Sequence, residues 1–236
     1  MEPLFLDTET TDSDENARLV QLAYKEANTD EIVNELFKPP VPISIDAMAV
    51  HHITNEMVED KPPFIGSATR ERLIAVLPER ILVAHSAPFD IRVLANEGVE
   101  TQAFINTLRV ARHVVDAPKH SLQYLRYFLK LNVKAQAHDA AGDVLVLESL
   151  YDHLVTVVRE RFQLALGQPV AEKMLELTQA PVLLKTLSFG KYEGQTFDTI
   201  LFADKPYLRT LLEIETQRPA HERNEDLIHT LKYTLD

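Results

Sequence analysis

Short apolar runs in the first 40 residues indicate three strands. Residues 3–8 (PLFLDT) turn from apolar to polar, which is typical of a buried strand that ends at the edge of a sheet. Residues 18–25 and 31–38 alternate between apolar and polar positions, and Asn28-Thr29-Asp30 between them suits a hairpin turn. The proline-rich stretch 39–42 then predicts extended backbone that cannot join a central ladder.

Helical spacing of apolar residues dominates the next part of the chain. The longest such pattern runs from Ala141 to about Leu166 and places Val144, Leu147 and Leu150 on one face. A short apolar strand is expected over 81–84, and further helices are expected over 70–77, 91–98, 108–114 and 122–131. Antiparallel strands followed by strand–helix alternation predict an α/β fold, with a mixed sheet flanked by helices.

The long helical pattern breaks around Gly167-Gln168-Pro169. We therefore predict one domain over 1–166, a linker over 167–186 and a small C-terminal module over 187–236. Glycines at 190 and 194 suggest a hairpin, followed by a short helix within 187–212 and a terminal helix after residue 216. The module is too short to bury much of a core of its own.

Composition narrows the class of protein. The chain has 236 residues, of which 45% are apolar and 25% charged, as in an ordinary globular protein. The absence of cysteine excludes disulfides and thiolate metal sites. No apolar run approaches the roughly 20 residues that span a bilayer, and Met1–Leu4 lacks the basic start of a signal peptide. We expect a cytoplasmic protein without membrane contact.

The net charge of −12 argues against broad, sequence-independent coating of nucleic acid. Two bound divalent ions would move the total to about −8 where a substrate binds. The charge is therefore compatible with a pocket that holds a few terminal nucleotides.

Asp7 and Glu9 form the first cluster of candidate chemistry. They lie two residues apart on a predicted strand, so both side chains project from the same face. Adjacent carboxylates raise each other's pKa unless a cation lies between them. The pair indicates either a metal site or a solvated strand end.

Two further clusters each follow or open a predicted element. In residues 85–90 (HSAPFD), Asp90 falls in the first turn of a helix, where it is either a functional carboxylate or a complement to the helix dipole. In residues 138–143 (HDAAGD), His138 precedes the long helix and Asp143 lies in its first turns. The alternative there is an acidic cap, with Asp139 as the capping residue.

In this order and spacing, the three clusters resemble the DnaQ-like exonucleases of the DEDDh type, within the ribonuclease H-like superfamily. The matching pieces are FLDTET at 5–10, His85-x-x-x-Phe89-Asp90 and His138-x-Ala140-x-x-Asp143. The resemblance implies a ribonuclease H-like sheet and a 3′–5′ exodeoxyribonuclease that releases 5′-mononucleotides, in DNA repair or end trimming. It also implies that four carboxylates hold two Mg²⁺ or Mn²⁺ ions and that His138 is the general base, the carboxylates being Asp7, Glu9, Asp90 and Asp143.

The resemblance extends to substrate contacts and to most of the chain. The implied substrate-binding residues are Thr8, Thr10, His51, Ile53, Thr54 and His85. Ile53 would pack on bases, whereas His85 would either contact substrate or order its loop. The loop at 42–62 and the segment FGKYEG at 189–194 resemble one DNA-directed subfamily. The expected partner is nucleic acid with a free 3′ end, DNA favoured, and the oligomeric state, a homodimer included, stays open.

Two features depart from the family pattern. Residues 11–15 (TDSDE) are acidic and would repel an approaching phosphate backbone, and Ser86 stands where asparagine is usual. Two rival functions are also weighed. One is an oligoribonuclease-like RNA exonuclease, because a 2′-hydroxyl contact depends on pocket geometry. The other is an inactive nucleic-acid-binding domain, which predicts a missing carboxylate or histidine, and none is missing. Lys119-His120-Ser121-Leu122 either approaches phosphate or is a solvated helix start.

Overall fold

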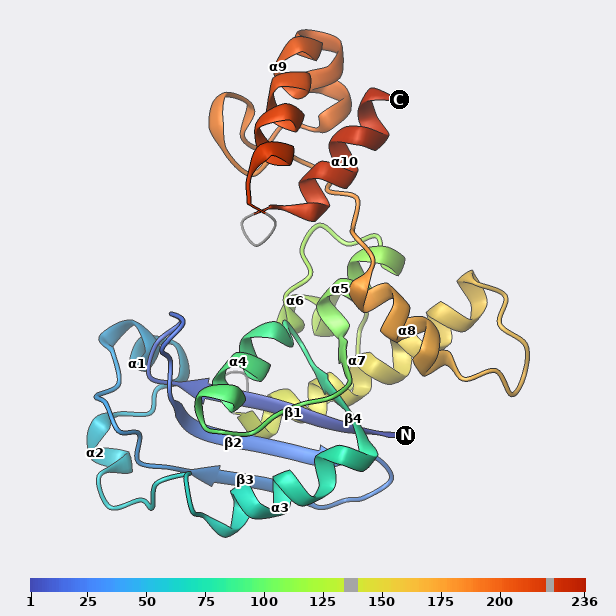
Figure 1. The fold of residues 1–236 in the computed structure, drawn as a ribbon. Coiled ribbons are helices and arrows are strands. Elements are labelled where there is room, and N and C mark those ends of the chain that lie inside the picture. Colours follow the sequence, from blue (N-terminus) through green and yellow to red (C-terminus); the bar gives the residue numbers. More distant parts are fainter. Residues whose placement is uncertain (134–139, 220–222) are drawn as a thin grey trace. The chain divides into compact units, whose positions relative to one another are not determined.

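A mixed sheet of five strands organises the N-terminal part of the chain (Figure 1). In this computed structural model, residues 1–133, 140–219 and 223–236 are described. The strand order is β3-β2-β1-β4-β5. Pairing is antiparallel from β1 to β2 and from β2 to β3, and parallel from β1 to β4 and from β4 to β5. The mixed α/β sheet expected from the sequence is confirmed. The strands are β1 (Glu2–Thr10), β2 (Leu19–Glu26), β3 (Ile32–Leu36), β4 (Arg80–Ala84) and β5 (Phe104–Asn106).

The alternation of side chains along β1 feeds two separate cores. Phe5 points to the face covered by α7 (Ala140–Arg161), where its ring lies 5.4 Å from that of Tyr151. Leu4 and Leu6 point to the other face and pack with residues of α3 (Ala68–Val76) and α4 (Pro88–Asn96). The period of two that places odd-numbered residues on one face therefore also places Asp7 and Glu9 on the side of α7.

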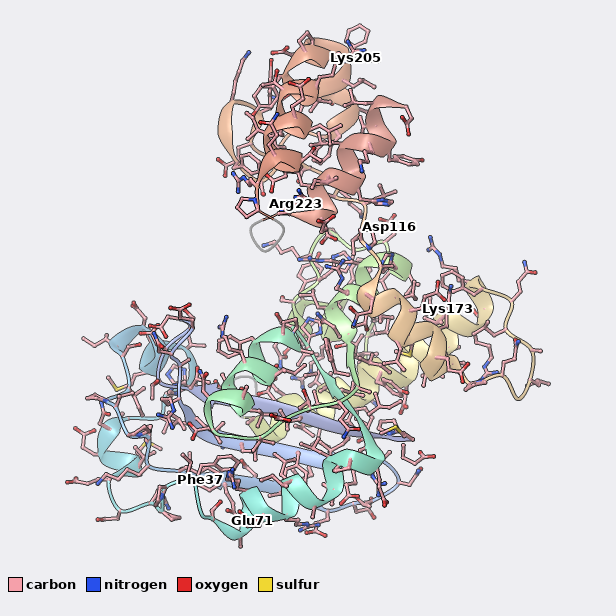
Figure 2. The ribbon with its side chains drawn as sticks, in the orientation of Figure 1. Phe37, Glu71, Asp116, Lys173, Lys205 and Arg223 are labelled. Carbon is pink, nitrogen blue, oxygen red and sulfur yellow. The ribbon has the colours of Figure 1, made fainter. Side chains whose placement is uncertain are left out.

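Three more helices complete the α7 side of the sheet. They are α5 (Thr107–Val114), α6 (Leu122–Phe128) and α8 (Val170–Gln179). Figure 2 draws the side chains on this framework and labels Glu71 on α3 and Lys173 on α8. The helix α8 lies within the range predicted as a linker, and its Met174 is fully buried in the core under α7.

Two short helices occupy the stretch that the sequence resemblance treats as a loop. They are α1 (Ile45–His51) and α2 (Asn55–Val58). Ser44 caps α1 by accepting a hydrogen bond from the amide of Ala47 at 3.1 Å, and His52 ends it in the left-handed region at φ 62°. Asn55 anchors the segment through side-chain bonds to the amide and carbonyl of Ile43.

The strand β1 changes its register with β2 near its end. Glu9 pairs with Gln21, but Thr10 pairs with Leu19, so Val20 is the extra residue of a bulge. The amide of Phe37 donates to the carbonyl of Val20 at 2.8 Å instead. Such bulges redirect the chain at the end of a strand, and here the bulge follows directly after the second acidic residue.

The chain divides into two compact units, Met1–Thr178 and Gln179–Asp236. The C-terminal unit contains α9 (Phe197–Gln217) and α10 (Glu225–Leu235), with a kink in α9 at Asp204, where φ is −155°. An antiparallel bridge, Thr186 to Thr196, closes the turn before α9. The unit has its own small core, made by Leu187, Phe197, Ile200, Leu208, Leu227 and Leu231. Across the described residues, every helix is too short or too polar to cross a bilayer.

Candidate active site

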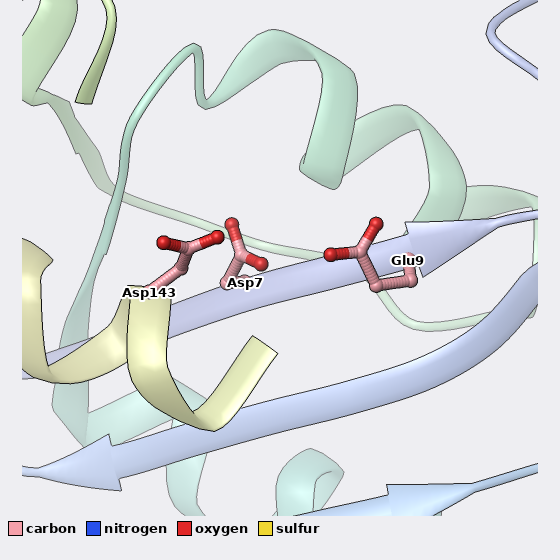
Figure 3. A group of neighbouring side chains, drawn as sticks. All are labelled: Asp7, Glu9 and Asp143. Carbon is pink, nitrogen blue, oxygen red and sulfur yellow. The ribbon is translucent and has the colours of Figure 1, made fainter. Parts of the chain in front are cut away.

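Three carboxylates gather where β1 passes the first turn of α7 (Figure 3). Asp7 and Glu9 come from the same face of β1, and Asp143 comes from α7. Their ligand atoms all lie within 4.8 Å of one another. Asp143 is only 8% exposed, so its charge is largely removed from water. Three anions at this separation repel one another strongly unless a cation lies among them.

The donor set fits a hard divalent cation. All three residues offer carboxylate oxygens, which suit Mg²⁺ and Mn²⁺ and do not select soft metals. The group is therefore a candidate metal site that the sequence predicted in part, through Asp7, Glu9 and Asp143.

Gln123 on α6 contacts this group of carboxylates. It was not predicted from the sequence. Its side-chain amide donates a hydrogen bond to Oδ1 of Asp143. Its carbonyl oxygen in turn accepts a bond from Nη1 of Arg126 at 3.2 Å, and Nη2 of Arg126 donates to the carbonyl of Val133 at 2.6 Å. Arg126 is 8% exposed, so a buried guanidinium fixes the glutamine that orients the carboxylate.

Asp90 belongs to a neighbouring position and not to the three-carboxylate group. It lies in the first turn of α4 and is 4% exposed. The hydroxyl of Thr8, the residue between Asp7 and Glu9, donates to Oδ1 of Asp90 at 2.8 Å. Burial raises the pKa of Asp90 to about 7, and the bond from Thr8 opposes that rise. The carboxyl is thus held against β1 and is not a solvated residue at a helix start.

His138, the expected general base, lies outside the described residues, as does Asp139. The described chain resumes at Ala140, the first residue of α7.

A pocket of about 260 Å³ lies beside Glu9. It combines backbone and polar groups from the end of β1 with apolar side chains from α1 and α4. Its lining residues are Thr8, Glu9, Thr10, Asp12, Ser13, Asp46, Ala47, Val50, His51 and Phe89.

His51 joins α1 to the end of β1. Its Nε2 lies 3.1 Å from the carbonyl oxygen of Thr10, and its Nδ1 lies 3.0 Å from the amide nitrogen of Ile53. A carbonyl only accepts and an amide only donates, so the ring is neutral with its proton on Nε2. Burial lowers the pKa of His51, and the bond to Thr10 opposes that effect. His51 therefore fixes the shape of the pocket wall.

Three other residues expected to bind substrate are Thr10, Thr54 and Ile53, and two of them are buried. Thr10 is 6% exposed and its hydroxyl donates to the carbonyl of Asp12 at 2.6 Å. Thr54 precedes α2 as its cap residue. Ile53 is 6% exposed and packs with Ile43 and other buried residues, so contact with a base would require the α1–α2 segment to move.

His85 links three segments around the end of β4. Its Nε2 lies 2.8 Å from the carbonyl oxygen of His120, and Nδ1 lies 3.0 Å from the hydroxyl of Thr107. Nε2 must donate to the carbonyl, and the single hydroxyl proton of Thr107 is shared between Nδ1 and the carbonyl oxygen of Ala84, 3.2 Å from the hydroxyl. Burial lowers the pKa of His85 to about 4, so the ring is neutral near pH 7. Both ring nitrogens are used within the protein, so His85 joins the end of β4 to the first residue of α5 and to the segment before α6.

The acidic loop after Thr11 is tied to α4. The side-chain amide of Asn96 donates to the carbonyls of Glu15 and Ala17 at 3.0 and 3.1 Å, and Arg92 donates to the carbonyl of Ser13 at 3.3 Å. These bonds use the loop's backbone carbonyls. Of the acidic residues in this loop, Asp12 lines the pocket beside Glu9, whereas Asp14 and Glu15 do not.

Comparison with known proteins assigns this architecture to a family. A family model described as an exonuclease (RNase_T) matches residues 4–151. Exodeoxyribonuclease 10 of Escherichia coli K12 is 32% identical, covering 98% of this chain and 97% of its own length. DNA polymerase III subunit epsilon of Rickettsia felis is 29% identical over 64% of this chain and 72% of its own.

Solved structures of exonucleases share the fold of this chain. Exonuclease X, in complex with 5′-overhanging duplex DNA, matches 75% of this chain and 99% of its own, with 28% identity and a TM-score of 0.58. Escherichia coli exonuclease I, in complex with a dT13 oligonucleotide, shares the fold at 17% identity and a TM-score of 0.56, over 68% of this chain. Exonuclease X is the subfamily that the loop at 42–62 and the segment at 189–194 resemble. The chain, with its mixed sheet and its acidic cluster on the first strand, belongs to the DnaQ-like family of 3′–5′ exonucleases.

Proposed function

We propose that this exonuclease acts on DNA, removing 5′-mononucleotides from a free 3′ end with the help of two Mg²⁺ or Mn²⁺ ions. The observation that carries the proposal is the convergence of Asp7, Glu9 and Asp143 within 4.8 Å of one another. Asp90, held by Thr8 beside the same strand, would be the fourth carboxylate. A role in DNA repair or in trimming of DNA ends would follow from this activity.

The reaction is a hydrolysis at phosphorus. The oxygen of a water molecule would form a bond to the phosphorus of the last internucleotide phosphate while the bond from phosphorus to the 3′ oxygen breaks. The phosphate leaves with the terminal nucleotide, and a new 3′ hydroxyl remains on the strand. Two divalent ions, when bound, stabilise the charge that develops on the attacking and leaving oxygens.

The side chains of the protein supply the remaining steps. His138 would take the proton from the attacking water, since an imidazole with a pKa near 6.5 suits that task near neutral pH. The 260 Å³ pocket beside Glu9 would hold the terminal nucleotide. Its apolar walls, Val50 and Phe89, would contact a base without reading its identity, because every base has an apolar face.

DNA is favoured over RNA because of the relatives. Exodeoxyribonuclease 10 is named for its action on DNA and aligns over nearly the whole chain, including the C-terminal unit. The structure of exonuclease X contains duplex DNA with a 5′ overhang.

The test uses one DNA strand labelled at either end and an RNA of equal sequence. Release of mononucleotide from the 3′ end of DNA in Mg²⁺, abolished by EDTA and slower on RNA, is the expected result. Faster loss of RNA would assign the protein to the oligoribonuclease-like alternative. Binding without cleavage in either Mg²⁺ or Mn²⁺ would favour the inactive binding domain.

Two variants separate the roles of the residues. Asp143→Ala should abolish cleavage while the protein stays folded, because a ligand of the metal site is lost. His138→Ala should lower turnover by on the order of 10²–10⁴ through loss of the general base. Wild-type turnover in either variant would remove that residue from the mechanism.

A further inference from the structure

The helix α6 exposes an aromatic face that the catalytic roles above do not use. The side chain of Tyr127 is 72% exposed and that of Phe128 is 44% exposed. The Phe128 ring stacks on that of Tyr124, with centroids 5.9 Å apart and planes inclined by 21°. Aromatic rings that adjoin one another on one short helix form an exposed apolar patch, and such patches, unlike single exposed residues, mark binding surfaces. We call Tyr124, Tyr127 and Phe128, with the flanking Lys119 and Lys130, the α6 surface.

The charge of this region is opposite to that of the rest of the chain. Residues 107–133 contain five lysine and arginine residues and one acidic residue, Asp116, in a protein whose net charge is −12. Lys119 precedes α6 and Lys130 follows it, and both are exposed. Local positive charge in an acidic protein favours an anionic partner at this position.

The α6 surface is continuous with the carboxylate group. Gln123, on the same short helix, donates to Asp143. Tyr127 follows Gln123 by four residues, so it lies on the same side of α6 about 6 Å further along the helix axis. A strand whose terminal phosphate reaches the carboxylates can therefore place a preceding base over Tyr127.

A cation–π contact with Arg126 also orients the ring of Tyr127. The guanidinium of Arg126 lies 5.4 Å from the centroid of that ring, and the same side chain is bonded to the carbonyl of Val133 and to Gln123. A fixed cation on one face holds the ring and leaves the other face to a ligand.

We propose that the α6 surface binds the single-stranded DNA that precedes the 3′-terminal nucleotide, with bases stacked on Tyr127 and Phe128 and phosphates near Lys119 and Lys130. The inference rests on the proposed exonuclease function and adds a second binding region to it. Stacking on aromatic rings tolerates any base, and lysines track the backbone, so binding would not depend on sequence.

The test measures binding and cleavage separately. Fluorescence anisotropy with a 5′-labelled oligothymidylate, in Ca²⁺ to suppress cleavage, should show Kd raised roughly 5- to 100-fold in Tyr127→Ala. Tyr127→Trp should keep wild-type Kd, whereas Tyr127→Leu, which keeps apolar bulk, should behave like Tyr127→Ala. Cleavage of the p-nitrophenyl ester of thymidine 5′-monophosphate, which has no preceding nucleotide, should be equal in all four proteins.

Charge is tested through salt. The slope of log Kd against log salt should fall by about 0.7 in Lys130→Gln, as expected for one lost phosphate contact. Lys61→Gln, at an exposed lysine outside residues 107–133, is the matched control and should leave the slope unchanged.

The outcomes distinguish the inference from the proposed function. If the wild type neither cleaves the ester nor binds the oligonucleotide, the proposed function fails. If it does both and Tyr127→Ala binds as the wild type does, only the α6 surface is overturned. A wild-type dimer that becomes monomeric in Tyr127→Ala would also overturn the inference, because the surface would then be covered by a second copy of the chain.

Discussion

Replacing Gln123 by methionine should weaken metal binding while the protein stays folded, although the bond from Arg126 to the glutamine carbonyl is also lost. Methionine has nearly the length and flexibility of glutamine but cannot donate to Oδ1 of Asp143. The lost bond is charge-assisted, and such bonds contribute about 1.5–3 kcal/mol. Converted at about 1.4 kcal/mol per tenfold, the loss corresponds to a roughly 10- to 100-fold weaker affinity, which is also typical of partners of metal ligands.

Two further variants complete the comparison, one at the same position and one as a control. Gln123→Glu would keep the acceptor for Arg126 but place a second negative charge beside Asp143. Without metal, the free energy of unfolding of this variant should therefore be lower than that of Gln123→Met. Gln102→Met changes an exposed glutamine of the same unit and is the matched control.

Isothermal titration with Mn²⁺ measures the affinity directly, and the Mg²⁺ concentration for half-maximal cleavage measures it through activity. Turnover at saturating metal should largely recover in Gln123→Met, because the effect lies in affinity. An Mn²⁺ affinity equal to that of the wild type would show that Gln123 does not position Asp143. Failure to recover at high metal would indicate a wider structural defect.

Four further outcomes follow from single residues. Thr8→Val should lower the free energy of unfolding in EDTA by about 1–3 kcal/mol, because Asp90 loses a donor while buried, and Thr8→Ser should not; equal urea midpoints for the two variants would contradict this. The pKa of His85 is lower in the folded state, about 4 against 6.5, so the unfolded chain binds the extra proton between these values. The contribution of His85 to the free energy of unfolding, about 3 kcal/mol, is present above pH 6.5 and is lost as the pH falls to about 4. His85→Gln should therefore flatten the dependence of this free energy on pH between about 4 and 6.5, measured by urea denaturation; an unchanged slope would refute it. Ser86 is exposed with φ 71°, so Ser86→Gly should stabilise the protein by about 0.5–1 kcal/mol; a lower melting temperature would rule out strain there. Asp7→Asn should stabilise the metal-free protein by relieving repulsion yet abolish the rise in melting temperature caused by Mg²⁺; a Mg²⁺-induced rise as large as in the wild type would exclude Asp7 as a ligand.

The parts of the fold that the sequence predicted are those with strong periodicity. The apolar run of β1 and the long stripe of α7 need no tertiary information, and the period of two places Asp7 and Glu9 on one face. The helices α1 and α2 were missed because seven and four residues are too few to show a pattern. The strand β5, with three residues, was missed for the same reason.

Contacts between distant segments were also beyond the sequence. The bond between Thr8 and Asp90 joins residues 82 positions apart, and that between Gln123 and Asp143 depends on how α6 packs against α7. The pKa values of His85 and Asp90 depend on burial, which only the packed structure fixes. A pattern can show which residues carry chemistry, but it cannot show which neighbours adjust that chemistry.

The pairing of β1 gives its two halves different resistance to opening. Its parallel pairing with β4 runs from Glu2 to Phe5, whereas its antiparallel pairing with β2 continues to Thr10. The first half is thus a central strand, and the half that carries Asp7 and Glu9 has, among the described residues, a paired strand on one side only. Amide hydrogens of Leu4 and Phe5 should exchange with solvent only when the whole unit unfolds, while those beyond Leu6 exchange through smaller, more frequent openings. A bound cation would slow the second class selectively, so hydrogen exchange along one strand would report occupancy of the site without any substrate.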